Sequence, residues 1–259
     1  MTTHTGIHTG PLKGGGPTGG GPTAGVPTTD VPAGGVPTTG DPAGQANPTE
    51  RAVTRPERVS DLATLLRSRR SVRKYQDRPV ARQLLEQILE AARWAPSPHG
   101  RQPWRFVVLT SQEQKIALAK GMGKTWQENL QMDGQSEEIV NTRLEKSRQR
   151  ILSAPALIIP CLYLEDLDRY PDAKRQADET TMAIQSLGAA IQNMLLMAYD
   201  LGLDSGWMCA PLFCPEIVCD TLALDTRLIP HALITVGYIA AEPQRRERLP
   251  LDELVLWVD

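Results

Sequence analysis

The apolar positions of this chain predict several helices separated by short strands. One helical face is marked by apolar residues at i, i+1, i+4, i+5 and i+8, namely Leu84, Leu85, Ile88, Leu89 and Ala92. A shorter helix is expected to begin at a Ser60 cap, another after Ser111, and a third over 215–222. The stretch 180–199 contains no charged residue and predicts a helix buried on all sides within protein.

Runs of aromatic and β-branched residues predict the strands. They cover 104–109, 156–164, 204–209 and 231–238. Pro160 has no N–H for a sheet ladder and therefore indicates a bulge or an edge at that point. Because helical sequence separates each strand from the next, the pattern is typical of an α+β or α/β layer structure.

The first 50 residues differ from the rest of the chain. They include 13 glycines, 8 prolines and 11 threonines, and a proline recurs every five residues from Pro17 to Pro42. Such a segment cannot bury enough apolar surface to offset the entropy of ordering its backbone. We therefore predict a disordered tail over 1–55 and one folded domain over 56–259.

Charge and cysteine content exclude several classes of protein. Outside the first 50 residues, 27 basic and 27 acidic side chains remain, and a neutral domain is not expected to bind nucleic acid. The four cysteines form no C-x-x-C pair, which favours reduced thiols in the cytoplasm and no metal site. Amides at Gln185, Gln192 and Asn193 argue against 180–199 as a membrane span, so no membrane association is expected.

Two arginine clusters are the strongest candidates for binding chemistry. The first consists of Arg69, Arg70, Ser71 and Arg73, and the second of Arg245, Arg246 and Arg248. Guanidinium groups and a hydroxyl suit a phosphate, provided that the fold brings the two clusters together. The alternatives are a solvated helix end, whose arginines complement the helix dipole, and a solvated loop.

A proline-rich loop over 95–104 is the third candidate. It has the sequence APSPHGRQPW and would hold His99, Gly100, Arg101 and Gln102 in one shape beside a planar ring. The chain contains no G-x-S-x-G, G-x-x-x-x-G-K-[ST] or G-x-G-x-x-G motif. Serine-hydrolase, P-loop and Rossmann chemistry therefore lack their usual sequence support.

Taken together, these motifs resemble the nitroreductase superfamily of FMN-dependent oxidoreductases. The likeness covers about 60–252 and rests on the segments 69–73, 96–104, 202–207 and 246–250. It implies a three-layer α/β/α sandwich with a mixed, mainly antiparallel sheet, in an intertwined homodimer with FMN at the subunit interface. The uncharged 180–199 helix would then form the dimer core.

The resemblance also implies roles for individual residues. Arg69, Arg70, Ser71, Arg246 and Arg248 would hold the FMN phosphate, and Arg73 would lie near the ribityl chain and the pyrimidine edge. Gly100 and Gln102 would meet the isoalloxazine, while the backbone of Met208, Cys209 and Ala210 would face flavin N5. Gly100 replaces an Asn common in relatives, so His99 or Arg101 could supply that contact. No side chain is assigned as a catalytic proton donor.

A narrower likeness concerns the substrate. Segments 95–106, 186–193 and 212–215 resemble the nitroreductase-like C-terminal half of the bifunctional protein of coenzyme F-420 biosynthesis. This implies that reduced FMN saturates a dehydro precursor of that deazaflavin coenzyme. The alternatives are an NAD(P)H-dependent reductase of nitroaromatics or quinones, a flavin-binding module without turnover, and an enzyme that destroys its flavin.

The polar segment 121–150 is a candidate substrate lid. Gly121, Gly123 and Gly134 are its possible hinges, and Trp126 is a candidate substrate contact. Arg143, Arg148 or Arg150 would meet the anionic tail of a phosphorylated substrate. The alternative is an exposed, salt-bridged helix.

Overall fold

The layers of the fold are built by alternate residues of one central strand. The computed structural model describes residues 61–245 and 247–258, all of which belong to one compact unit. The predicted tail over 1–55 and the predicted cap Ser60 lie outside these residues. The helices are α1 (Leu62–Ser68), α2 (Arg82–Arg93), α3 (Gln112–Met132), α4 (Glu137–Leu152), α5 (Ala173–Asp200) and α6 (Pro215–Leu222), with 3-10 turns η1 (Pro98–Gly100), η2 (Ala210–Phe213) and η3 (Leu251–Glu253).

The sheet has five strands, β1 (Trp104–Leu109), β2 (Ala156–Tyr163), β3 (Asp204–Met208), β4 (Leu228–Pro230) and β5 (Leu233–Gly237). Their order is β1-β2-β5-β3, and β4 pairs with β2 beyond the end of β5. All of these pairs are antiparallel, while Ser71 forms an isolated parallel bridge with Ser205. The expected mainly antiparallel sheet is therefore confirmed.

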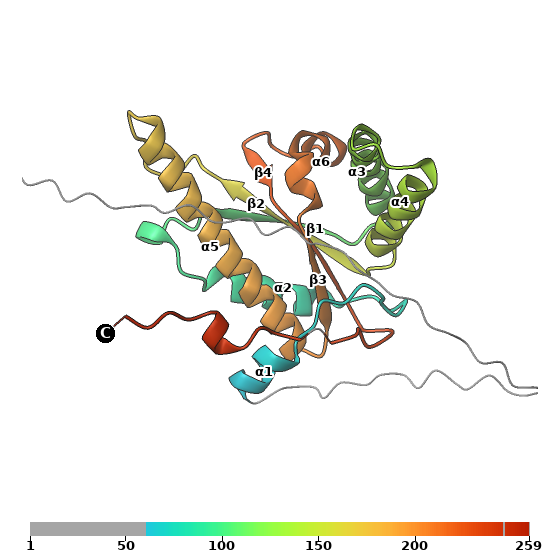
Figure 1. Cartoon of the computed structure of the whole chain (residues 1–259), viewed down its shortest axis with the longest axis horizontal. Helices are drawn as coiled ribbons and strands as arrows, with labels where there is room; N and C mark the ends of the chain where they lie inside the picture. The colour runs from blue at the N-terminus through green and yellow to red at the C-terminus, as the bar shows by residue number, and fades with distance from the viewer. Residues whose placement is uncertain (1–60, 246, 259) are drawn as a thin grey trace, which may run out of the picture. The chain divides into compact units, whose positions relative to one another are not determined.

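Two helical layers cover the two faces of this sheet. On one face, Ile158 and Leu162 of β2 share a core with α2 and α5. On the other face, Leu157 and Ile159 share a second core with α3, α4 and α6. Figure 1 shows α2 and α5 on one side of the strands and α3, α4 and α6 together beyond them. The predicted three-layer α/β/α arrangement is confirmed, and it follows from the two-residue period of β2.

Pro160 lies in the interior of β2, opposite Phe106 of β1. On its other side, the N–H groups of His231 and Ala232 both donate to the Pro160 carbonyl, at 3.0 and 3.4 Å. His231 and Ala232 therefore face the single residue Pro160, as in a β-bulge. The bulge lies in the gap between the end of β4 and the start of β5.

Three sequence expectations need correction. The cap of α1 is Asp61, whose carboxylate accepts from the N–H groups of Ala63 and Thr64. Gly121 and Gly123 lie inside α3, which packs on α6, and they are therefore not hinges. Of the three glycines, only Gly134, with φ of +71°, lies at the turn between α3 and α4. Helix α5 is not buried on all sides of the single chain, since Ile184 is 43% exposed.

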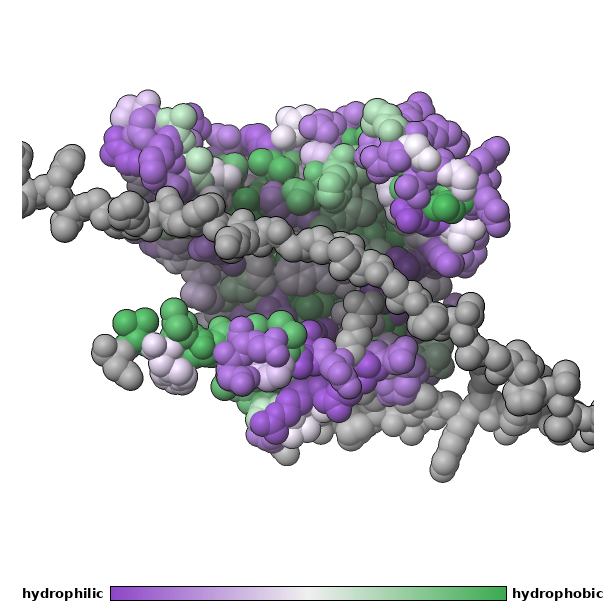
Figure 2. Space-filling model, in the orientation of Figure 1, coloured by the Kyte–Doolittle hydropathy of each residue, from purple (hydrophilic) through white to green (hydrophobic). Residues whose placement is uncertain are grey.

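The C-terminal segment exposes many apolar side chains. Six of them are more than 60% exposed: Leu249, Leu251, Leu254, Leu256, Trp257 and Val258. Figure 2 shows this segment as hydrophobic surface on the side where the chain ends. A contiguous exposed apolar patch of this kind is typical of an interaction surface.

Candidate active site

The arginine segment 69–73 is fixed to the start of β3. It follows directly from α1, and the Val72 N–H donates to the Ser205 carbonyl at 2.9 Å. Val72 is buried in the second core, whereas Ser71 and Arg73 on either side are exposed. Extended alternation therefore turns Ser71 and Arg73 toward the surface while Val72 anchors the backbone.

This segment and the chain near 243–248 enclose a pocket of ≈ 700 Å³. The pocket is lined by Leu66, Arg67, Arg69, Arg70, Ser71, Arg73, Pro243, Gln244, Arg245 and Arg248. The two arginine clusters, nearly 180 positions apart in sequence, are thus brought to one place. Arg246, which was also predicted to belong here, lies outside the described residues.

The described part of the chain offsets the positive charges in this pocket only in part. Burial, and then the nearby charges of Arg248 and Arg70, lower the pKa of Arg69, while the carboxylate of Asp204 acts in the opposite direction. Among the described residues no acidic side chain forms an ion pair with Arg69, Arg73 or Arg248. Like charges held close together without a counter-ion favour the binding of an anion.

Arg70 and Arg245 have a different role from the other arginines. An Nη of Arg70 donates to the carbonyls of Arg67 and Arg69, at 2.5 and 2.7 Å. An Nη of Arg245 donates to the Arg67 carbonyl at 3.3 Å. These two guanidinium groups cap the C-terminal end of α1, as the helix-dipole alternative predicted. Arg69, Arg73 and Arg248 are left to face a ligand.

The proline-rich loop has an unusual backbone. His99, Gly100 and Gln102 have φ of 54°, 66° and 51°, in the left-handed region that only glycine adopts readily. The Gln102 N–H donates to the Ser97 hydroxyl at 3.0 Å, which helps to hold this shape. Strained backbone of this kind is concentrated at functional sites. However, no residue of the loop lines the arginine pocket of the same chain.

The other predicted site residues are also spread over the single chain. Arg101 pairs with Asp168 at 2.6 Å, next to the start of α5. Met208 lies at the far end of β3 from Ser205, about 10 Å along the strand, and is followed by exposed Cys209 and Ala210. Trp126 is half-buried on α3, and Arg143 is exposed on α4. None of these six residues lines the arginine pocket.

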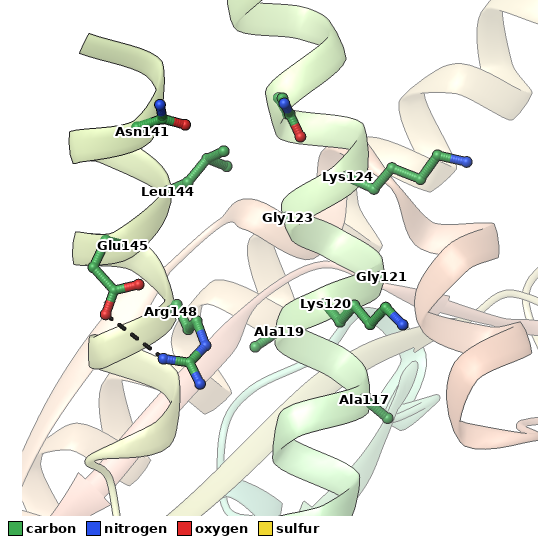
Figure 3. A pocket seen from close by; sticks show the side chains of 11 residues that line it. Ala117, Ala119, Lys120, Gly121, Gly123, Lys124, Asn141, Leu144, Glu145 and Arg148 are labelled. Atoms are coloured by element: carbon green, nitrogen blue, oxygen red, sulfur yellow. Dashed lines mark ion pairs between the residues drawn. The ribbon is translucent and has the colours of Figure 1, made fainter. Parts of the chain in front are cut away.

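A second hollow of ≈ 830 Å³ lies along α3 and α4. Figure 3 shows Asn141, Leu144 and Arg148 of α4 facing α3, while Lys120 and Lys124 of α3 point away from α4. Arg148 is paired with Glu145 at 3.6 Å. Of the described residues predicted to contact FMN or the substrate, only Arg148, a candidate for the substrate's anionic tail, lines this hollow.

Two buried charged residues, Asp204 and Lys115, were not predicted to have a role. Asp204 is buried at the start of β3, and its charge reaches both Arg69 and Tyr75. Lys115 of α3 is buried and donates to the Ala154 carbonyl at 2.8 Å. The one sequence signal that could have identified these two residues is a charged side chain at a position where the hydrophobic pattern predicts the core.

The comparison with known proteins identifies the family. Residues 66–238 match the Nitroreductase family. The chain belongs to the nitroreductase family. A Thermus thermophilus NADH dehydrogenase is 32% identical over 223 residues, covering 77% of this chain and 97% of that protein.

Solved nitroreductase structures agree with this assignment. A BluB-like flavoprotein from Clostridium difficile is 25% identical, with a TM-score of 0.66 over 78% of this chain and all of that one. A Desulfovibrio desulfuricans protein described as a nitroreductase in complex with FMN is 27% identical, with a TM-score of 0.60 over 78% and 99% of the two chains. Among the described residues of this nitroreductase, no helix is long and apolar enough to cross a membrane, and no three His, Cys, Asp or Glu side chains could together hold a metal ion.

Proposed function

We propose that this nitroreductase is an FMN-dependent oxidoreductase that takes hydride from NAD(P)H and passes it to a small organic acceptor. The observation that carries the proposal is the meeting of Arg69, Arg73 and Arg248 in one pocket, where among the described residues none of the three forms an ion pair with an acidic side chain. The relatives named as NADH dehydrogenase and as an FMN complex support it.

The pocket fits the phosphate end of FMN. Arg69 and Arg248 offer guanidinium forks, and Ser71 offers an exposed hydroxyl, which together suit a phosphate dianion. Arg73, at the same pocket, would place positive charge beside the ribityl chain and the pyrimidine edge. Bound FMN would supply the hydride chemistry at its N5. The chain itself orients the cofactor and adds positive charge that favours an anionic reduced state.

We also propose that the protein is a homodimer in which a second copy completes each flavin site. The strained 97–102 loop does not line the arginine pocket of its own chain, so Gly100 and Gln102 would have to come from a second copy. The half-exposed face of α5 around Ile184 and the apolar C-terminal segment are surfaces that such a partner would cover.

Gly188→Met is expected to dissociate this dimer. Gly188 lies on α5, and a Cβ built there would meet nothing within 4 Å in the single chain. The larger side chain therefore leaves the monomer fold intact but obstructs a partner packed on this helix. Sedimentation velocity should show a monomer, with loss of bound FMN. Gly123→Met, at an equally open glycine on α3, is the control, and a variant of Gly188 that remains dimeric would contradict the proposal.

For the physiological acceptor we propose a dehydro precursor of coenzyme F-420. The support is the likeness of the segments 95–106, 186–193 and 212–215 to the corresponding half of the F-420 biosynthesis protein. A general reductase of nitroaromatics and quinones is the second candidate, favoured by the name of the NADH dehydrogenase relative.

The purified protein is expected to be yellow, with an FMN absorption band that NADH or NADPH bleaches under anaerobic conditions. Reoxidation is then measured with the dehydro precursor and with a nitroaromatic. Faster turnover of the nitroaromatic would overturn the F-420 assignment. Reoxidation by either acceptor no faster than that of free FMN would indicate a flavin-binding module. Loss of the FMN band after aerobic reduction would indicate flavin-destroying chemistry.

A further inference from the structure

Tyr75 is a buried residue that packs against the segment carrying Ser71 and Arg73. Its hydroxyl group donates to the Val72 carbonyl at 3.1 Å. Burial raises the pKa of Tyr75 above its ordinary value, so the hydroxyl keeps its proton and remains a donor. Because Tyr75 does not line the arginine pocket, any effect that it has on a ligand there must pass through this segment.

Thr235 of β5 determines which way the Tyr75 hydroxyl points. Thr235 is buried, and its Oγ1 lies 2.7 Å from the Tyr75 hydroxyl oxygen and 3.3 Å from the Gly206 carbonyl oxygen. An O–H···O bond is most favourable near about 2.7–2.8 Å, so we assign the Thr235 proton to the Tyr75 oxygen. The Tyr75 proton is then free for the Val72 carbonyl. The opposite direction would leave that carbonyl, in a buried residue, without this donor.

The Val72 carbonyl belongs to the peptide unit that leads into Arg73. The preceding peptide unit, which joins Ser71 to Val72, is held by the Val72 N–H, which donates to the Ser205 carbonyl at 2.9 Å. The peptide units on both sides of Val72 are therefore fixed, one by β3 and the other by Tyr75. Since Ser71 and Arg73 both line the arginine pocket, the directions of their side chains depend on these two hydrogen bonds.

We propose that Tyr75 is a positioning residue which, together with Thr235, orients the 71–73 segment so that the pocket selects phosphorylated over unphosphorylated flavin. This inference rests on the proposed function. FMN and riboflavin share the ring and the ribityl chain, so contacts of Arg73 with those parts are common to both and cancel when the two affinities are compared. The hydroxyl of Ser71 and the charge of Arg73 favour the phosphate dianion of FMN alone, and they do so only when they are held in the right direction.

The test measures the dissociation constants of FMN and of riboflavin by fluorescence quenching with the full-length apoprotein. Tyr75→Phe keeps the ring and removes the hydroxyl, and the ratio of the riboflavin constant to the FMN constant is expected to fall about tenfold. Thr235→Val removes the donor that orients Tyr75 and should lower the ratio about threefold, whereas Thr235→Ser, which keeps a hydroxyl, should stay within about twofold of the wild type. Tyr163→Phe is the matched control, because the Tyr163 hydroxyl accepts from an Nη of Arg227 at 3.3 Å and not from the 71–73 segment. It should leave the ratio unchanged.

A purely structural role of Tyr75 would give a different result. In that case Tyr75→Phe lowers the Tm or raises both dissociation constants by the same factor, and the unchanged ratio overturns the inference. An equal fall of the ratio in Thr235→Val and Thr235→Ser would also overturn it, because the packing of residue 235 and not its hydroxyl would then matter. If Tyr75→Phe does not fold, the two Thr235 variants decide alone. A wild-type protein that binds no FMN, or that binds riboflavin as tightly as FMN, would instead refute the proposed function.

Discussion

Replacing both Arg69 and Arg248 by methionine is expected to give a folded but colourless protein. Each guanidinium would lose a charge-assisted contact to the FMN phosphate, and such contacts contribute about 1.5–3 kcal/mol each. Since every 1.4 kcal/mol is about tenfold in affinity, the dissociation constant for FMN should rise about 10²- to 10⁴-fold. Quenching of FMN fluorescence on titration with apoprotein measures it directly.

The apoprotein provides the more discriminating half of this experiment. Without an anion, Arg69 and Arg248 repel each other, and burial already lowers the pKa of Arg69. Their replacement should therefore leave the Tm of the apoprotein unchanged or raise it, while the extra stability that FMN confers on the wild type disappears. A fall in the Tm of the apoprotein would mean that these arginines hold the fold together.

Arg82→Met and Arg169→Met serve as controls for this double variant. Both arginines are exposed and form i,i+4 ion pairs, with Glu86 and Glu165 respectively. Exposed pairs contribute little to stability, so neither change should affect the binding of FMN. If the double variant retains FMN as tightly as these controls, the phosphate is held elsewhere and the proposed site is wrong.

Local pattern was enough to predict much of the secondary structure. The apolar face of α2 has a clear helical period, and its core residues Leu85, Ile88 and Ala92 are buried as that period requires. Ser111 caps α3 as predicted, with its hydroxyl accepting from the Gln114 N–H. These features depend on residues within a few positions of one another, which is why one sequence can reveal them.

Features that depend on distant partners were predicted poorly. Gly121 suggested a hinge, but a Cβ there would lie 3.0 Å from side chains of Ile217 and Thr221, so the glycine permits close packing of α3 on α6. The α5 sequence suggested complete burial, yet part of that surface faces outward in the single chain. Neither the close packing at Gly121 nor the exposure of α5 can be predicted without knowing which element packs against that helix.

The candidate site shows the same limit. Local chemistry marked each arginine cluster as a possible anion site, but their convergence joins positions nearly 180 residues apart and was expected only from the family likeness. The separate role of Arg70 as a cap of α1 depends on side-chain direction, which composition does not specify.

Among substitutions that add a single methyl group near the site, Gly206→Ala is expected to be the most damaging. Gly206 lies in β3, and a Cβ there would be 2.5 Å from the Val72 carbonyl oxygen and 2.8 Å from Thr235 Oγ1. The first contact is with backbone, which can move away only if the 69–73 segment leaves β3. Overpacking typically costs about 1–3 kcal/mol, and a forced backbone shift adds to it.

The loss should appear both in stability and in cofactor binding. For a domain of this size about 3 kcal/mol corresponds to a fall in Tm of roughly 6–12 °C. Because Val72 lies between Ser71 and Arg73, its displacement should also weaken FMN binding, although no residue that faces the phosphate has been changed. Differential scanning calorimetry and FMN titration of the same preparation measure the two effects.

Gly123→Ala distinguishes the clash from the mere loss of a glycine. A Cβ at Gly123 meets nothing within 4 Å, and alanine is favoured over glycine inside a helix by about 0.5–1 kcal/mol, so this variant should be slightly more stable than the wild type. Opposite shifts in Tm for the two variants would tie the arginine segment to β3 through the 2.5 Å approach at Gly206. Equal Tm and equal FMN affinity for Gly206→Ala and the wild type would show that the 69–73 segment can move away from β3 without cost. The position of Ser71 and Arg73 would then not depend on this contact.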